Sequence, residues 1–184
     1  METGDSLKLL VEYRPLTEGQ LSLSYIARNM SGKKIYLFNR LFRADKTGKR
    51  SIDKNRIYCN VDGDVAYVSK RLIRVPDGVL VESPEVPYLT QLDPGASFEE
   101  NLTLATPLPL DVPYLRPTGP VDKPVLCRTL IFTLGYFVAR EHGWVRTITK
   151  NGENILATDY GFAVQADQVE TASIPGVRIP CLTS

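Results

Sequence analysis

The chain has 184 residues, enough for one domain with a sizeable hydrophobic core and too few to require two. Hydrophobic residues make up 43% of the sequence and charged residues 23%, and the formal net charge is +1. This balance excludes a disordered chain, which combines low hydrophobicity with high net charge. We therefore expect a single folded domain over residues 1–184.

Export, membrane insertion and metal binding find no support in the local sequence. The first nine residues contain acids and one lysine, rather than the basic start and apolar run of a secretory signal. The apolar stretch 126–139 contains Arg128 and is too short to cross a bilayer. Cys59, Cys127 and Cys181 fit neither a disulfide framework nor a zinc site, so we expect buried, reduced thiols. These features predict a cytoplasmic protein without a membrane, metal or cofactor partner.

Apolar and polar residues alternate with a period of two along most of the chain, which is typical of strands with one buried face. Turn residues such as those at 45–48, 92–95 and 151–152 separate the alternating stretches. No run of ten residues has helical periodicity, although a short helical turn is open for 49–55. In chain order, the predicted strands are 7–13, 21–27, 34–43, 56–61, 65–73, 98–104, 126–139, 144–149, 155–158 and 160–166.

The segment 34–43 differs from the other predicted strands because both of its faces are partly apolar. Ile35 and Leu37 lie on one face, and Tyr36 and Phe38 lie on the other. A strand that is buried on both sides has this pattern, so we expect 34–43 at the centre of a sheet.

Two proline-containing segments interrupt the alternation. Six prolines fall within 107–124, and proline lacks the amide donor that a central strand needs. We expect this segment to be an extended connection or an exposed loop, and the stiff segment 174–180 to lie along a sheet edge. Together with the regularly spaced strands, these features predict an all-β fold, an immunoglobulin-like β-sandwich with a Pro-rich connection.

Two motifs carry a resemblance to a known group of domains. A strand that ends in Asn29 with a short turn, Ala27-Arg28-Asn29-Met30-Ser31-Gly32, is followed by an aromatic-rich strand and later by Leu92-Asp93-Pro94-Gly95-Ala96-Ser97-Phe98. This layout resembles bacterial immunoglobulin-like β-sandwich domains, including the intracellular proteinase inhibitors of bacilli, over residues 7–105. The resemblance implies the sandwich fold and an inhibitor or adaptor role. The Pro-rich segment and the last three strands have no counterpart in it.

The titratable residues suggest no catalytic centre. His142 is the single histidine and lies in a turn, Glu141-His142-Gly143, so a Ser/His or Cys/His mechanism would have to use it. A hydrolase centred on His142 is one alternative. Asp53, Asp62 and Asp64 have the oxygen ligands that calcium prefers, but Asp62-Gly63 is also common hairpin chemistry. We expect neither an enzyme nor a metal site.

Charge is unevenly distributed along the chain. Residues 28–74 contain thirteen Lys and Arg against four acids, a net of +9, whereas 75–122 contain eight acids against one Arg, a net of −7. If the two segments form separate surfaces, a basic face could bind nucleic acid or another polyanion. If their strands pack together, the charges neutralise each other. The polyanion-binding alternative has four candidate residues: Lys33, Lys34, Arg40 and Arg43.

A non-enzymatic protein-binding or structural module is the leading functional hypothesis, with an adaptor or inhibitor as its specific form. Sheet edges and exposed loops recognise extended partners. The Pro-rich segment contains a Pro-x-x-Pro spacing at 117–120, which a groove could recognise. Its candidate partner-binding residues are Tyr114, Leu115, Arg116 and Pro117.

Overall fold

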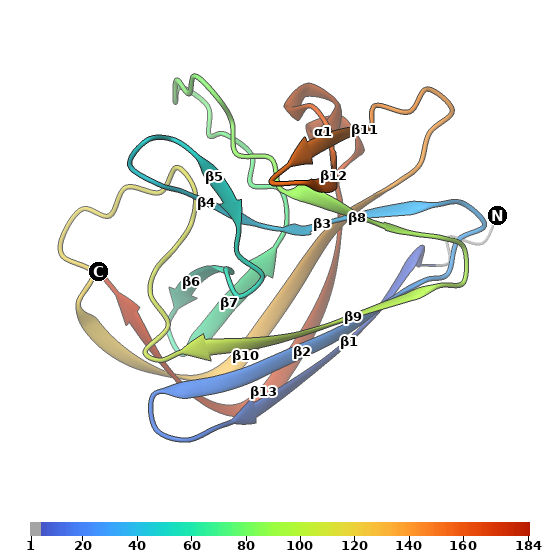
Figure 1. The fold of residues 1–184 in the computed structure, drawn as a ribbon. Coiled ribbons are helices and arrows are strands. Elements are labelled where there is room, and N and C mark those ends of the chain that lie inside the picture. The colour runs from blue at the N-terminus through green and yellow to red at the C-terminus, as the bar shows by residue number, and fades with distance from the viewer. Residues whose placement is uncertain (1–4) are drawn as a thin grey trace.

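The structure is a computed structural model that describes residues 5–184 (Figure 1). Within this range the chain forms thirteen strands and one short helix, which confirms the predicted all-β class. None of its helices is long and apolar enough to span a bilayer in the described range. The elements are β1 (Leu7–Pro15), β2 (Gln20–Asn29), β3 (Ile35–Arg40), β4 (Phe42–Ala44), β5 (Arg50–Ile52), β6 (Tyr58–Asp62), β7 (Val65–Lys70), β8 (Tyr88–Leu92), β9 (Ser97–Ala105), β10 (Lys123–Val138), β11 (Arg146–Lys150), β12 (Glu153–Ala157), α1 (Tyr160–Ala166) and β13 (Gln168–Thr183).

The strands form a three-stranded sheet, a large sheet and a separate β4–β5 hairpin. The three-stranded sheet has the order β1-β2-β9, and the large sheet has the order β11-β12-β8-β3-β10-β7-β6. β13 pairs with β10 along almost its whole length. β10 and β7 run parallel, whereas the other strand pairs of residues 5–184 are antiparallel.

The main core lies between the three-stranded sheet and the large sheet. Alternate residues of β2 and β10 point into it, as their period-two patterns predict. Tyr25 stacks on Phe132 with ring centroids 5.1 Å apart, which joins the two sheets. Burial of each such large side chain stabilises the fold by about 1.5–3 kcal/mol. The residues that β2 and β10 contribute include Leu21, Leu23, Tyr25, Ala27, Leu130, Phe132 and Leu134.

β3 lies inside the large sheet, as the sequence predicts. It pairs with β8 on one side and with β10 on the other. Ile35 and Leu37 are buried in the main core, while Phe38 belongs to a second core that Tyr36 packs against. The strand is shorter than predicted, since it ends at Arg40 and the chain then enters the β4–β5 hairpin.

The prediction of a final strand at 160–166 is wrong, because this segment is the helix α1. Ala163 and Ala166, three residues apart, are both buried against the second core, as helical spacing requires. Seven residues are too few to distinguish a period of two from one of 3.6 when apolar residues occur throughout. Residues 49–55 form β5 and a turn rather than a helical turn.

Two further strands, β8 and β13, also differ from the prediction. β8 has no predicted counterpart, although the sequence places a turn directly after it. The proline-containing segment 174–180 lies in an edge strand as expected, but that strand, β13, is sixteen residues long.

The Pro-rich segment is an extended connection, as predicted. Leu108 exchanges backbone hydrogen bonds with Pro180 and Leu182 on β13, and Asp111 does so with Cys59 on β6. Between these contacts and β10 the chain forms the outer yellow loop of Figure 1. The segment therefore bridges two strands without forming a strand itself.

Candidate functional site

The structure does not bring the four predicted polyanion-binding residues together. Lys33 and Lys34 precede β3 and are exposed, whereas Arg40 ends this strand. Lys34 and Arg40 are six positions apart on an extended chain, a span of about 20 Å. Arg40 and Arg43 are also already engaged by carboxylates. Their ion pairs are Arg40–Glu153 at 2.9 Å and Arg43–Asp53 at 2.8 Å.

Charges of the basic and acidic segments meet inside the fold. Arg56 lies 2.8 Å from Glu85 and 3.2 Å from Asp111, and its side chain is largely buried. Lys70 lies 2.9 Å from Glu100. The two segments thus neutralise each other's charge at these contacts, as expected where their strands pack together.

His142 and the cysteines lie in different parts of the molecule. His142 is exposed in the turn after β10, whereas Cys127 lies near the start of that strand and is buried. Eleven residues of β10 span roughly 35 Å, so no direct hydrogen bond can join these two side chains. Cys59 and Cys181 are buried and free as well. Within residues 5–184, no group of three His, Cys, Asp or Glu residues has a geometry that could hold a metal ion.

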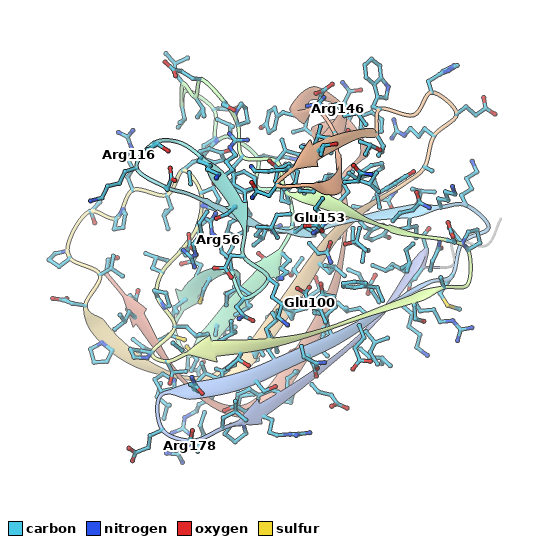
Figure 2. The ribbon with its side chains drawn as sticks, in the orientation of Figure 1. Arg56, Glu100, Arg116, Arg146, Glu153 and Arg178 are labelled. Atoms are coloured by element: carbon cyan, nitrogen blue, oxygen red, sulfur yellow. The ribbon has the colours of Figure 1, made fainter. Side chains whose placement is uncertain are left out.

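The predicted partner-binding residues occupy the outer loop of the Pro-rich connection. Tyr114 is half-buried, and its hydroxyl oxygen accepts a hydrogen bond of 2.6 Å from the backbone N–H of Glu85. Leu115, Arg116 and Pro117 are exposed, and Figure 2 shows Arg116 at the periphery of the molecule. Three consecutive side chains of this prediction are therefore accessible to a partner.

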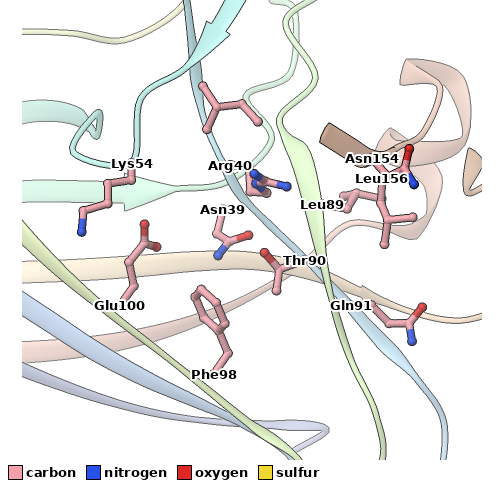
Figure 3. Close-up of a pocket in the computed structure, with 11 residues that line it drawn as sticks. Asn39, Arg40, Lys54, Leu89, Thr90, Gln91, Phe98, Glu100, Asn154 and Leu156 are labelled. Carbon is pink, nitrogen blue, oxygen red and sulfur yellow. The ribbon is translucent and has the colours of Figure 1, made fainter. Parts of the chain in front are cut away.

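A cleft that the sequence does not predict lies between β9 and the strands β3, β8 and β12. Its volume is about 470 Å³. Figure 3 shows that side chains from both sheets converge on it. Its lining residues include the apolar Leu89, Phe98 and Leu156, of which Leu89 and Leu156 also pack in the second core, and the polar Asn39, Thr90 and Gln91.

A network of buried polar groups lies beside this cleft. The Lys70 ammonium is fully buried and donates to Glu100 Oε1 at 2.9 Å and to the carbonyl of Lys54 at 2.5 Å. Glu100 Oε2 accepts from the Tyr25 hydroxyl at 2.5 Å, and Asn39 Nδ2 donates to the same hydroxyl at 3.2 Å. Each donor group in this chain of contacts, the Lys70 ammonium, the Tyr25 hydroxyl and the Asn39 amide nitrogen, therefore has at least one acceptor.

Burial dominates the electrostatics of this network. It lowers the pKa of Lys70, an effect that the neighbouring Glu100 carboxylate opposes. It also raises the pKa of Tyr25 well above its ordinary value, and the negative charge of Glu100 raises it further. Lys70 and Glu100 thus form a buried ion pair at 2.9 Å, and Figure 2 shows Glu100 between the sheets.

One atom of the network lacks a partner. Asn39 is only 2% exposed, and its Oδ1 accepts no hydrogen bond. An unpaired buried carbonyl oxygen costs about 1–3 kcal/mol. Because Asn39 lines the cleft between Phe98 and Thr90, a bound group with an N–H or O–H could remove this cost (Figure 3).

The backbone of β9 borders the same cleft and has a free edge. β9 pairs with β2 and with no other strand of the described chain. The N–H of Thr103 donates to Asn55 Oδ1 at 3.2 Å and so points away from β2. Backbone groups of an antiparallel strand alternate in direction, so those of Glu99 and Asn101 also point away from β2. The free edge of β9 is defined here as residues 97–101.

The outer strands of the large sheet and β13, which pairs with its β10, are less open to pairing in the described chain. Asp111 covers β6 by two hydrogen bonds with Cys59, at 2.8 and 3.0 Å. Pro175 and Pro180 remove donors from β13, a common protection of edge strands. β11 has five residues and begins and ends with a basic one. The three-stranded sheet has a second outer strand, β1, but no residue of β1 lines the cleft. The free edge of β9, which borders the cleft, is therefore the candidate for strand addition.

Sequence reasoning missed the cleft, although one signal for it exists. Glu100 shares the inward face of β9 with Phe98 and Leu102, and Lys70 follows the buried Val68 on β7. A charged residue in an apolar alternation is a candidate member of a buried pair. The alternation does not identify its partner, because β7 and β9 lie in different sheets.

Comparison with known proteins adds no assignment. No family model matches this chain, and no curated protein has significant similarity to it.

Proposed function

We propose that the protein is a non-enzymatic binding module that takes an extended segment of a partner protein as an additional strand on β9. The observation that supports this most directly is the free edge of β9, which borders an open cleft of about 470 Å³. Strand addition obtains affinity from main-chain hydrogen bonds and specificity from pockets for alternate side chains. The backbone groups of Glu99 and Asn101 supply the hydrogen bonds, and the cleft supplies the pocket.

The chemistry of the cleft favours binding over catalysis. Glu100 is the carboxylate that lines the cleft, but both of its oxygens accept hydrogen bonds, from Lys70 and Tyr25. A general base needs an oxygen that can reach a substrate proton. His142 lies in an exposed turn after β10, outside the cleft lining.

We also propose that the fold is an immunoglobulin-like sandwich. The packing of the three-stranded sheet across the main core from the large sheet supports an immunoglobulin-like sandwich. By the resemblance, the module acts as an inhibitor or adaptor. The unpaired state of Cys59, Cys127 and Cys181 supports a reducing, cytoplasmic compartment.

Selection of peptides tests this function. A phage-displayed library of random, unstructured twelve-residue peptides is selected against the protein, and binders are measured by calorimetry. Asn101→Pro removes an N–H that points away from β2, so it should weaken these peptides at least tenfold without breaking a β2–β9 hydrogen bond. Asn101→Ala keeps that N–H, and binding should persist. Amide hydrogen exchange at Glu99 and Asn101 should slow in the complexes.

Two results would contradict strand addition at β9. Peptides that bind without protecting the amides of Glu99 and Asn101 would be bound elsewhere. Loss of binding on replacing 115–117 with Gly-Ser-Gly, while Asn101→Pro has no effect, would identify the outer loop of the Pro-rich connection as the contact surface.

A further inference from the structure

We propose that the cleft selects a tyrosine or tryptophan side chain of the strand that adds to β9. This inference rests on the proposed function and identifies the class of partner: an extended peptide whose inward-facing residue is an aromatic with a hydrogen-bond donor. Three features of the cleft lead to it, namely its position relative to the edge, its walls and its unpaired acceptor.

The position follows from strand geometry. Residues directly opposite each other on paired strands project to the same face of the sheet. Phe98 and Glu100 project inward from β9 and line the cleft. A partner residue paired beside them therefore projects into the cleft, while its two neighbours along the partner strand face solvent.

The walls favour a large, largely apolar side chain. Leu89, Leu156 and Phe98 lie around the cleft, and Phe98 presents an aromatic ring. The volume of about 470 Å³ falls within the range of about 300–1,000 Å³ typical of ligand pockets. Aromatic side chains bury more area than any others and pack well against such rings.

The unpaired acceptor favours tyrosine and tryptophan over phenylalanine as the occupant of the cleft. Asn39 Oδ1 is buried without a donor, so an occupant that supplies one gains a hydrogen bond that the free protein lacks. The tyrosine hydroxyl and the tryptophan indole N–H are such donors on apolar rings, whereas phenylalanine has none. Phenylalanine would fill the space and leave the oxygen unpaired.

The charges of the cleft exclude lysine and arginine as occupants. A buried cation needs a free carboxylate, but Glu100 already pairs with Lys70. Arg40 and Lys54 line the same cleft and would repel a further positive charge. The cleft thus accepts a neutral donor rather than a charged one.

Titration with blocked amino acids tests the selectivity. The probes are N-acetyl-tyrosinamide, N-acetyl-tryptophanamide and N-acetyl-phenylalaninamide. Their binding is monitored by NMR of the isotope-labelled protein. The tyrosine and tryptophan amides should shift the Asn39 side-chain amide and the Thr90 and Leu89 methyl signals, and should bind at least fivefold tighter than the phenylalanine amide. Asn39→Leu should remove this preference, and Asn60→Leu on the exposed face of β6 should retain it.

A second variant covers the case in which Asn39→Leu does not fold. Thr90→Trp fills the cleft from β8 and should block all three probes without removing a buried polar group. Equal binding of the phenylalanine and tyrosine amides to the wild-type protein would overturn the inference. Shifts confined to residues outside the cleft would also overturn it.

The selected peptides separate this inference from the proposed function. If peptides protect the Glu99 and Asn101 amides but show no preference for tyrosine or tryptophan over phenylalanine, the cleft inference fails and strand addition stands. If N-acetyl-tyrosinamide and N-acetyl-tryptophanamide bind as expected and no peptide protects the backbone amides of Glu99 and Asn101, strand addition fails. Protection together with the aromatic preference supports both.

Discussion

The buried pair of Lys70 and Glu100 makes the sharpest prediction at the scale of single residues. Lys70→Met removes one charge and leaves the Glu100 carboxylate in the interior with the Tyr25 hydroxyl as its remaining side-chain partner. Breaking a buried pair in this way costs about 3 kcal/mol or more. Urea denaturation of the variant should show a loss of this size in the free energy of unfolding.

Two further variants control this measurement. Lys70→Met combined with Glu100→Gln removes both charges and keeps a group that can bond to Tyr25, so it should recover most of the loss. Arg40→Ala breaks the exposed Arg40–Glu153 pair and should cost no more than about 1 kcal/mol. A cost of Lys70→Met as small as that of Arg40→Ala would contradict the prediction.

Asp167 predicts a pH dependence of stability. Burial raises its pKa to about 6 from an ordinary 3.8, although the nearby Arg74 and Arg71 oppose the shift. The folded state therefore holds this proton more tightly than the unfolded state. Its stabilising contribution is complete below about pH 4 and is lost as the pH rises through about 6. Asp167→Asn should match the wild type at pH 4 and be more stable at pH 7 in urea denaturation.

Asp45 provides a control of opposite sign. Hydrogen bonds from the Thr47 hydroxyl, the Thr47 N–H and the Lys49 N–H lower the pKa of this carboxyl. Its contribution to stability is present above its ordinary pKa of 3.8 and is lost as the pH falls. Asp45→Asn should therefore be less stable than the wild type at pH 7, and the difference should shrink on acidification. If Asp167→Asn and Asp45→Asn changed the stability at pH 7 in the same direction, the opposite pKa shifts assigned to these two carboxyls would be refuted.

At the scale of elements, Gly135 marks the point where β10 changes neighbours. β7 pairs with β10 up to Leu134, and β3 pairs with it from Tyr136. The chain that leaves β7 crosses at this point, so a Cβ on Gly135 would lie 2.6 Å from the Arg71 Cβ and 2.9 Å from its Cα. Gly135→Ala should therefore destabilise the protein by about 1–3 kcal/mol, measured by thermal unfolding.

Gly161 offers a matched glycine without such a neighbour. It lies in α1, and apart from its chain neighbours and the backbone of the helix itself, no atom would lie within 4 Å of a Cβ there. Alanine is the better helix former by about 1 kcal/mol, so Gly161→Ala should raise the melting temperature slightly. A loss of stability at Gly161 comparable to that at Gly135 would show that close contact is not the cause.

At the scale of the whole molecule, the basic and acidic segments of the chain are joined by ion pairs. Ion pairs connect the basic segment 28–74 with the acidic segment 75–122 at Arg56 and Lys70. We therefore expect weak retention on heparin, with elution below about 0.15 M salt, where the screening length is about 8 Å.

Variants of the predicted basic residues test this expectation. Lys33→Gln with Lys34→Gln, and Arg40→Gln with Arg43→Gln, should each change the elution salt only slightly. Their effects should be independent, because about 20 Å of strand separates the two pairs. Strong retention that all four substitutions abolish together would instead support a polyanion-binding surface.

The sequence by itself determined the all-β class, most strand positions, the central place of β3 and the extended Pro-rich connection. Each of these depends on side-chain periodicity or on the missing amide of proline, which are properties of neighbouring residues along the chain. The helix α1 escaped this reasoning because its seven residues satisfy both periods.

Only the tertiary structure decided which charges meet and where the chain is open to a partner. The cleft joins residues of β3, β8, β9 and β12, and the buried pair joins β7 with β9. No local pattern encodes such long-range neighbours, because alternation specifies the face on which a side chain lies but not the strand opposite it. For the same reason, Asn39 is an ordinary strand residue in the sequence and becomes an unpaired acceptor only when two sheets close around it.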